Sequence, residues 1–288
     1  MPLSALALVL AGAALHATWN YFAKRAAGGL AFVWLYGLVS VAAATPLAFV
    51  LDFSGLGEIG VAGWIAISAS AALHVVYGLV LQHGYRVADF SVIYPMARST
   101  GPLFAVLLAV LLFAERPSPA GWAGIAAIVS GVLLMAHSPS SNPHSDRLAR
   151  GLLWGAATGL CIAAYTALDA WAVKTLALAP LLYYLPSLVV RSVLLAPQAL
   201  ANRTALAEQW KTQRLPILVV GLLSPLAYVL VLHAMVLAPL AYVAPAREVS
   251  MLIALFIGAR LLSEAITTTR VLGTAAMVGG VILLALAH

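Results

Sequence analysis

Charged residues are scarce in this sequence, and cysteine is almost absent. Only 8% of the 288 residues are Asp, Glu, Lys or Arg, whereas soluble domains carry roughly 25%. A chain that is also 64% hydrophobic has too few polar groups to cover a water-exposed surface, which excludes a soluble globular protein. Cys161 is the single cysteine, so disulfides within the chain are excluded and a cysteine-based metal site is not expected.

The positive net charge does not indicate a nucleic-acid partner. The chain carries a formal charge of +6, but nearly all Lys and Arg residues fall in short gaps between apolar runs, where membrane topology places them. The runs themselves are about twenty residues long, enough to cross the hydrocarbon core of a bilayer as helices. We therefore expect an all-α, multi-pass integral membrane protein of a bacterial inner (plasma) membrane, in contact with lipid.

Ten apolar runs are separated by charged residues, glycine or proline. They predict ten transmembrane helices, near residues 3–22, 29–51, 62–83, 91–113, 119–137, 151–173, 177–199, 215–235, 239–261 and 271–287. The segment "SPSSNPHSDRLAR", residues 138–150, is too polar to lie in lipid and predicts a linker. It divides the chain into a first five-helix repeat, residues 1–137, and a second, residues 151–288.

The two halves resemble each other at one constant offset. This offset aligns Arg98 with Arg247, Glu115 with Glu264, Gly124 with Gly273, Gly131 with Gly280 and Asn20 with Asp169. Because each half has an odd number of spans, we expect two inverted repeats, the architecture of transporters whose substrate site lies near the bilayer midplane. The spacing of Gly124 and Gly131 favours close helix packing, either within the fold of a monomer or at the interface of a homodimer.

Two segments carry a family resemblance. They are "GPLFAVLLAVLLFAERPSPAGWAGIAAIVSGVLLMA" and "LIALFIGARLLSEAITTTRVLGTAAMVGGVILLALA". Both resemble the closing helix pair of the EamA branch of the drug/metabolite transporter superfamily, in which an apolar helix is followed by Glu, a polar turn and a glycine-containing helix. Glu115 and Glu264 match the Glu, and Gly124 and Gly273 match the first Gly. The resemblance covers both halves and implies a transporter.

The orientation of the chain is left open by two conflicting arguments. The connections after the odd-numbered spans carry most of the Lys and Arg residues, and by the positive-inside rule this places both termini outside the cell. The family resemblance implies the opposite, with both termini inside.

Five ionisable residues lie within the predicted spans. They are Arg98, Arg191, Arg247, Asp169 and Glu248. Each arginine at mid-membrane costs roughly 2.5–3.5 kcal/mol unless partners or water compensate, so we expect these residues to face a polar cavity between the halves. They could form internal ion pairs that fix helix packing, or they could bind an anionic substrate. Glu248 follows Arg247 directly and is expected to reach another helix instead of its neighbour.

Polar and aromatic residues share helix faces with these charges. His16, Trp19 and Asn20 lie on one face of the first span, and Tyr165 lies one turn from Asp169 in the sixth. The predicted substrate-binding residues are Arg98, Arg247, Tyr94, His16, Trp19, Asn20, His74, Tyr77, Tyr165, Tyr184 and Arg191. For His16 and His74 a purely structural role is an equal alternative. An interfacial belt is the preferred interpretation for Trp34, Trp64, Trp122, Trp154, Tyr36 and Tyr183.

Pro95 and Pro245 stand close before the two repeat-related arginines. A proline removes a backbone donor and loosens the preceding turn, and transporters use such broken helices to expose backbone groups to substrate. A simple helix start or kink is the equal alternative.

Motifs of known enzyme classes are missing from the chain. It contains no H-E-x-x-H or G-x-S-x-G sequence, and we expect no enzyme activity, cofactor or metal. The expected function is secondary transport of a small anionic or zwitterionic metabolite, an amino acid or similar compound, by alternating access and in the direction of export. We expect coupling to protons carried by Glu248 or Asp169. The alternatives are a transporter of neutral or cationic drug-like compounds, a passive channel or an intramembrane enzyme.

Overall fold

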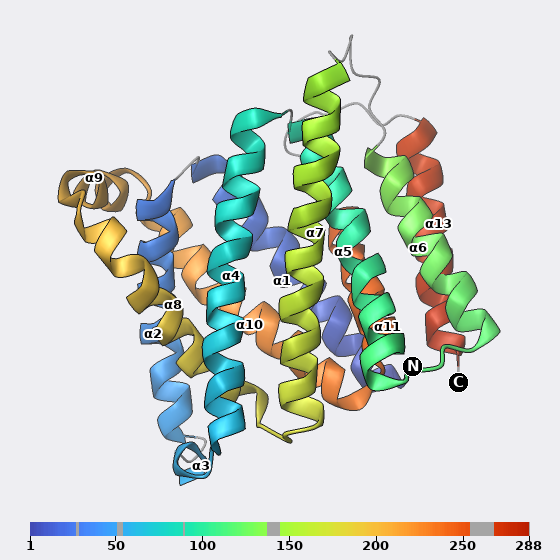
Figure 1. The fold of residues 1–288 in the computed structure, drawn as a ribbon, viewed down its shortest axis with the longest axis horizontal. Coiled ribbons are helices and arrows are strands. Elements are labelled where there is room, and N and C mark those ends of the chain that lie inside the picture. The colour runs from blue at the N-terminus through green and yellow to red at the C-terminus, as the bar shows by residue number, and fades with distance from the viewer. Residues whose placement is uncertain (27–28, 51–53, 89, 137–144, 254–267, 288) are drawn as a thin grey trace.

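The computed structural model describes residues 1–26, 29–50, 54–88, 90–136, 145–253 and 268–287, and its regular elements within these ranges are all helices (Figure 1). The helices of the first half are α1 (Leu3–Ala26), α2 (Leu30–Val50), α3 (Ser54–Gly57), α4 (Val61–Val87), α5 (Phe90–Phe113) and α6 (Pro119–Ala136). Those of the second half are α7 (Ser145–Lys174), α8 (Pro180–Leu200), α9 (Arg203–Thr212), α10 (Arg214–Leu237), α11 (Leu240–Ala246), the 3₁₀ turn η1 (Arg247–Val249) and α13 (Thr268–Leu286). The predicted all-α class is confirmed.

The apolar runs correspond closely to the observed helices. Within the described ranges, 6 helices are long and apolar enough to cross a membrane, namely α1, α4, α5, α7, α8 and α10. Shorter apolar stretches lie in α2, α6 and α13. The predicted ninth span, 239–261, is described only as far as residue 253, so the count of ten stays a prediction. The helix of α7 also includes residues 145–150, which the sequence placed in the linker, because a polar segment without proline or glycine can continue a helix outside the hydrocarbon.

Helices of one half pack against helices of the other. α1 packs on α10, α4 on α7, α2 on α8, and α6 on α13. In the two repeats α1 corresponds to α7 and α4 corresponds to α10, so the contact of α1 with α10 is equivalent to the contact of α7 with α4. In Figure 1, α7 starts at the upper end of the molecule, whereas α1 starts near the N label at the lower end. Equivalent helices therefore run in opposite directions, as two inverted repeats require.

The contact between α6 and α13 depends on glycine. A Cβ atom on Gly131 would lie 2.6 Å from the carbonyl oxygen of Gly273, and one on Gly280 would lie 2.7 Å from the carbonyl oxygen of Gly124. Any larger residue at these positions would force the two helices apart. The glycines that the sequence assigned to close packing thus serve it within the fold.

The face at which α1 starts and α13 ends, here called the terminal face, is held by one carboxylate. After α5, Ala114 has a φ of 51°, and this turn directs Glu115 toward the start of α11. The two carboxylate oxygens of Glu115 accept hydrogen bonds from the backbone N–H groups of Leu240 and Ala241, both at 2.9 Å. Glu115 therefore satisfies donors that α11 leaves free at its N-terminus, where the helix dipole also favours a negative charge.

Lys174 completes this arrangement from the end of α7. Its ammonium group donates to Glu115 Oε1 at 3.1 Å and to the carbonyl oxygen of Ala238 at 3.3 Å. We call Glu115, Lys174, Ala238, Leu240 and Ala241 the Glu115 clasp. The clasp joins the first half of the chain, which contains Glu115, to the second half. All seven residues of α11 are buried next to it.

We expect Glu115→Gln to destabilise the fold by about 1–2 kcal/mol, because the amide keeps one acceptor but loses the charge that the α11 N-terminus and Lys174 bind. This corresponds to a fall in melting temperature on the order of 2–6 °C for a chain of this size. Glu58→Gln is the matched control, since Glu58 is exposed. Equal melting temperatures of the two variants in detergent would contradict the assignment.

Candidate functional site

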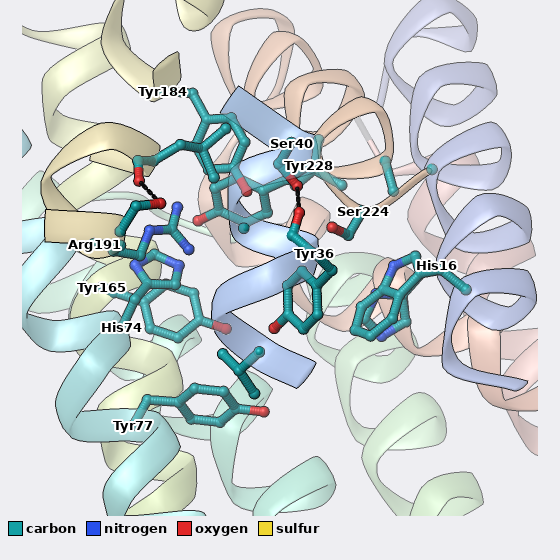
Figure 2. Close-up of a pocket in the computed structure, with 18 of the residues that line it drawn as sticks. His16, Tyr36, Ser40, His74, Tyr77, Tyr165, Tyr184, Arg191, Ser224 and Tyr228 are labelled. Atoms are coloured by element: carbon teal, nitrogen blue, oxygen red, sulfur yellow. Dashed lines mark hydrogen bonds between the residues drawn. The ribbon is translucent and has the colours of Figure 1, made fainter. Parts of the chain in front are cut away.

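A central cavity of about 200 Å³ lies between the two halves. Its lining residues come from α1, α2, α4, α5, α7, α8, α10 and η1 (Figure 2). Most of the predicted substrate-binding residues line it, namely His16, Trp19, His74, Tyr77, Arg98, Tyr165, Tyr184, Arg191 and Arg247. The polar and aromatic helix faces that the sequence predicts therefore line one common cavity.

The cavity has a largely aromatic wall. The rings of His74 and Tyr165 are stacked with their centroids 3.9 Å apart, and those of Tyr184 and Tyr228 are tilted at 5.0 Å. Figure 2 shows Arg191 beside Tyr184, Tyr165 and His74, across the cavity from His16. Such a wall offers flat apolar faces as well as hydroxyl groups.

For three aromatic residues of this region the interfacial-belt prediction is wrong. Trp34 and Tyr36 were assigned to the interfacial belt but line the cavity, and Tyr183 is completely buried. The belt interpretation fits Trp64 and Trp122, which are exposed. Gly37 and Ser40 share the cavity-facing surface of α2 with Tyr36, and this small and polar stripe was the available signal.

Tyr228 is not among the substrate-binding residues that the sequence predicts. It lies in α10, one turn after Ser224, and both residues line the cavity. Ser224 and Pro225 interrupt an otherwise apolar run, and this interruption could have drawn attention to the helix.

Arg98 is held by an ion pair between the halves. Its Nε atom lies 3.0 Å from Glu248 Oε2, and its Nη2 atom donates to Ser250 Oγ at 2.9 Å. Glu248 thus reaches another helix, as its position beside Arg247 suggested. The pair links α5 to the segment that begins with η1.

Arg191 and Arg247 face aromatic rings instead of carboxylates. The guanidinium carbon of Arg191 lies 5.1 Å from the Tyr184 ring centroid, and that of Arg247 lies 5.5 Å from the Tyr228 centroid. The Nε and Nη2 atoms of Arg191 are buried and have no hydrogen-bond partner among the described residues. Cation–π contacts stabilise such groups only modestly, so these donors remain suited to an anion.

Asp169 lies behind the aromatic wall. It is completely buried and accepts hydrogen bonds from the hydroxyl groups of Tyr183, at 2.5 Å, and of Tyr228. The guanidinium group of Arg247 lies over the ring of Tyr228. Tyr228 therefore contacts both the buried Asp169 and an arginine of the cavity. Among the described side chains, no group of three or more His, Cys, Asp or Glu is placed to hold a metal ion.

The remaining predicted residues lie elsewhere. Asn20 lines a second cavity that Glu248 also borders. The side chain of Tyr94 lies outside the described residues. Pro245 directly precedes α11's last residue and the 3₁₀ turn η1 at Arg247, whereas α5 continues unbroken through position 95. In the second half the helical path thus tightens to a 3₁₀ turn at the arginine and continues as a helix over residues 250–253, whereas the described α5 has no such turn.

The comparisons with known proteins agree with this geometry. The model of the EamA-like transporter family matches residues 3–136 and 149–286. This chain belongs to the EamA-like transporter family. The predicted family is thereby confirmed, and the protein is an integral, multi-pass membrane transporter. The two matched segments are the two halves between which the central cavity lies.

One solved crystal structure shares the fold of this family member. It is 15% identical, with a TM-score of 0.82, and the match covers 99% of this chain and 98% of the other. At that identity the likeness concerns the fold alone. A comparison with curated proteins finds no match.

Proposed function

We propose that this EamA-like protein is a secondary transporter that exports a small organic anion or zwitterion, an amino acid or similar compound, by alternating access. The observation that carries the proposal is the pair Arg191 and Arg247, which border the central cavity without a carboxylate partner among the described residues. Two such cations in a membrane interior are costly unless a ligand or water compensates them.

The charges around the cavity favour an anion. Arg98 is balanced by Glu248, while Asp169 is separated from the cavity by Tyr228. Arg191 and Arg247 are therefore the anion-binding residues of this proposal, and Arg98 mainly positions η1. Guanidinium groups pair carboxylates through two parallel hydrogen bonds, and the aromatic wall would receive the apolar body of the substrate.

The position of the cavity supports alternating access. Its lining residues lie in the middle of α1, from Gly12 to Trp19, and in the first half of α2, from Val33 to Ser40. The α2 segment belongs to the half of its helix that lies away from the terminal face, and at the terminal face the Glu115 clasp and buried α11 join the two halves of the molecule. We infer that the site opens toward the opposite face in this state and that the clasp must break before it opens toward the terminal face.

The distribution of charge between the two membrane faces supports one orientation of the protein. The ends of α4, α7, α9 and α10 opposite the terminal face carry Arg86, Arg150, Arg203, Lys211 and Arg214. By the positive-inside rule that face is cytoplasmic, which would make the described state open to the cytoplasm and ready to load an exported substrate.

A reporter enzyme fused after the last helix tests this orientation in a bacterial inner membrane. We expect activity of a periplasm-dependent reporter such as alkaline phosphatase, because the terminal face then lies outside. Fusion of the same reporter into the loop before α10 is the control and should be inactive. The reverse pattern would place the termini inside and invert the proposed loading direction.

We expect Arg247→Lys and Arg191→Lys each to reduce transport about tenfold or more, because an ammonium group cannot make the bidentate contact to a carboxylate. Counterflow of a labelled substrate in proteoliposomes is the measurement, since neither a passive channel nor an enzyme produces counterflow. Arg150→Lys, at an exposed position, is the matched control. Normal transport by both cavity variants would refute the anion site and favour a neutral or cationic substrate.

We also propose that protons drive the export, with Glu248 or Asp169 as the carrier. Protonating Glu248 would release Arg98, whereas protonating Asp169 would remove a negative charge next to Tyr228 and Arg247. Either step changes how strongly the cavity attracts an anion.

We expect an imposed pH gradient to drive the parent protein and not the variant that lacks the carrier. Transport is measured in proteoliposomes for Glu248→Gln and Asp169→Asn, with Glu58→Gln as an exposed control. A parent that ignores the gradient would rule out proton coupling. Two variants that respond like the parent would show that another group carries the proton.

A further inference from the structure

A second cavity of about 160 Å³ adjoins the central one. It extends between α1, α5 and α7 and is bordered by polar residues that the central cavity lacks, among them Asn20, Thr158, Thr166 and Glu248. The wall common to both cavities consists of His16, Trp19, Tyr77, Arg98, Tyr165 and Arg247. A ligand held by Arg247 could therefore reach into either space.

Thr166 has an unusual environment in this second cavity. Its side chain is only 1% exposed, and its hydroxyl has no hydrogen-bond partner among the described residues. A threonine within a helix commonly donates to the carbonyl group four residues earlier. Thr158, in the same helix and the same cavity, does so to the carbonyl oxygen of Trp154 at 2.7 Å. Thr166 differs, and its buried hydroxyl is left unsatisfied at the border of the second cavity.

The shared wall holds a second donor in the same condition. The indole N–H of Trp19 is buried and also lacks a partner among the described residues. Buried polar groups in native proteins are almost always satisfied. The unpartnered hydroxyl of Thr166 and the unpartnered indole of Trp19 border the same cavity as Arg247, so this cavity suits a ligand that carries a hydrogen-bonding group close to its anionic group.

We propose that Thr166 determines substrate specificity by forming a hydrogen bond with a hydroxyl or ammonium group on the carbon next to the substrate carboxylate. The inference rests on the proposed function, in which Arg247 binds the carboxylate. The carboxylate lies at the shared wall, the apolar body occupies the central cavity, and the second polar group enters the second cavity. The Thr166 hydroxyl can donate to or accept from that group, and Glu248 supplies a negative charge nearby.

This arrangement selects 2-hydroxy and 2-amino acids over plain carboxylic acids. A site built to hydrogen-bond a substrate group rejects the analogue that lacks it, because the polar groups of the site then stay unpaired. An apolar pocket alone would not make this distinction.

The test compares 3-phenyllactate, phenylalanine and 3-phenylpropionate, which share a carboxylate and a ring and differ at the second carbon. Their dissociation constants are measured by calorimetry on the purified full-length protein. We expect the parent to bind at least one of the first two about tenfold more tightly than 3-phenylpropionate. Thr166→Val should reduce that preference to about threefold or less and leave the binding of 3-phenylpropionate unchanged.

Matched variants separate this role from a structural one. Thr18→Val, which removes a hydroxyl bonded to the carbonyl oxygen of Ala14 in its own helix and lining neither cavity, should keep the preference, and Thr166→Ser should restore it. A purely structural role of Thr166 would lower the melting temperature without changing the ratio of dissociation constants, and this result would overturn the inference.

Two other outcomes separate the role of Thr166 from the proposed anion site at Arg247. A parent that binds all three compounds equally, with binding lost in Arg247→Lys, would keep the anion site and refute the role of Thr166. If none of the three compounds binds, the proposed anion site fails and the inference fails with it.

Discussion

The ion pair between Arg98 and Glu248 joins the two halves of the molecule at its centre. An isolated guanidinium or carboxylate within the hydrocarbon would be strongly unfavourable, and pairing the two removes much of that penalty. The pair also fixes α5 against η1, which sets where Arg247 stands. Among the described residues, Glu248 is the acid that borders the second cavity, and its pairing with Arg98 leaves Arg191 and Arg247 without a carboxylate partner.

The helices and the convergence of polar residues could be predicted from the sequence because both depend on local patterns. Apolar runs gave the spans, and the i, i+3 and i+4 spacing of His16, Trp19 and Asn20 gave the cavity-facing side of α1. Which arginine would pair with Glu248 could not be predicted, since Arg98 lies in the other half of the chain. Nor could composition separate Tyr36, inside the cavity, from Trp64, which is exposed, because aromatic residues suit both places. The resemblance identified Glu115, but its partners on α11 required the fold.

The two halves share a fold but not a distribution of charge. The positions aligned with Asp169 and Glu248 in the first half are Asn20 and Ser99, and the 3₁₀ turn η1 has no counterpart in α5 among the described residues. In an inverted-repeat transporter the two end states are related by exchanging the conformations of the halves. Because Asp169 and Glu248 belong to one half only, the two end states of the proposed cycle would differ in energy, and the empty protein would favour one of them.

The 3₁₀ turn η1 places opposite charges on consecutive residues. With three residues per turn, Arg247 and Glu248 point in directions about 120° apart, and Glu248 is bonded to Arg98 while Arg247 lies over Tyr228. Because the two residues are adjacent in the chain, a displacement of the Arg247 backbone also displaces Glu248. A substrate that pulls Arg247 toward the central cavity would therefore strain the ion pair between Glu248 and Arg98 on the other side of the same turn.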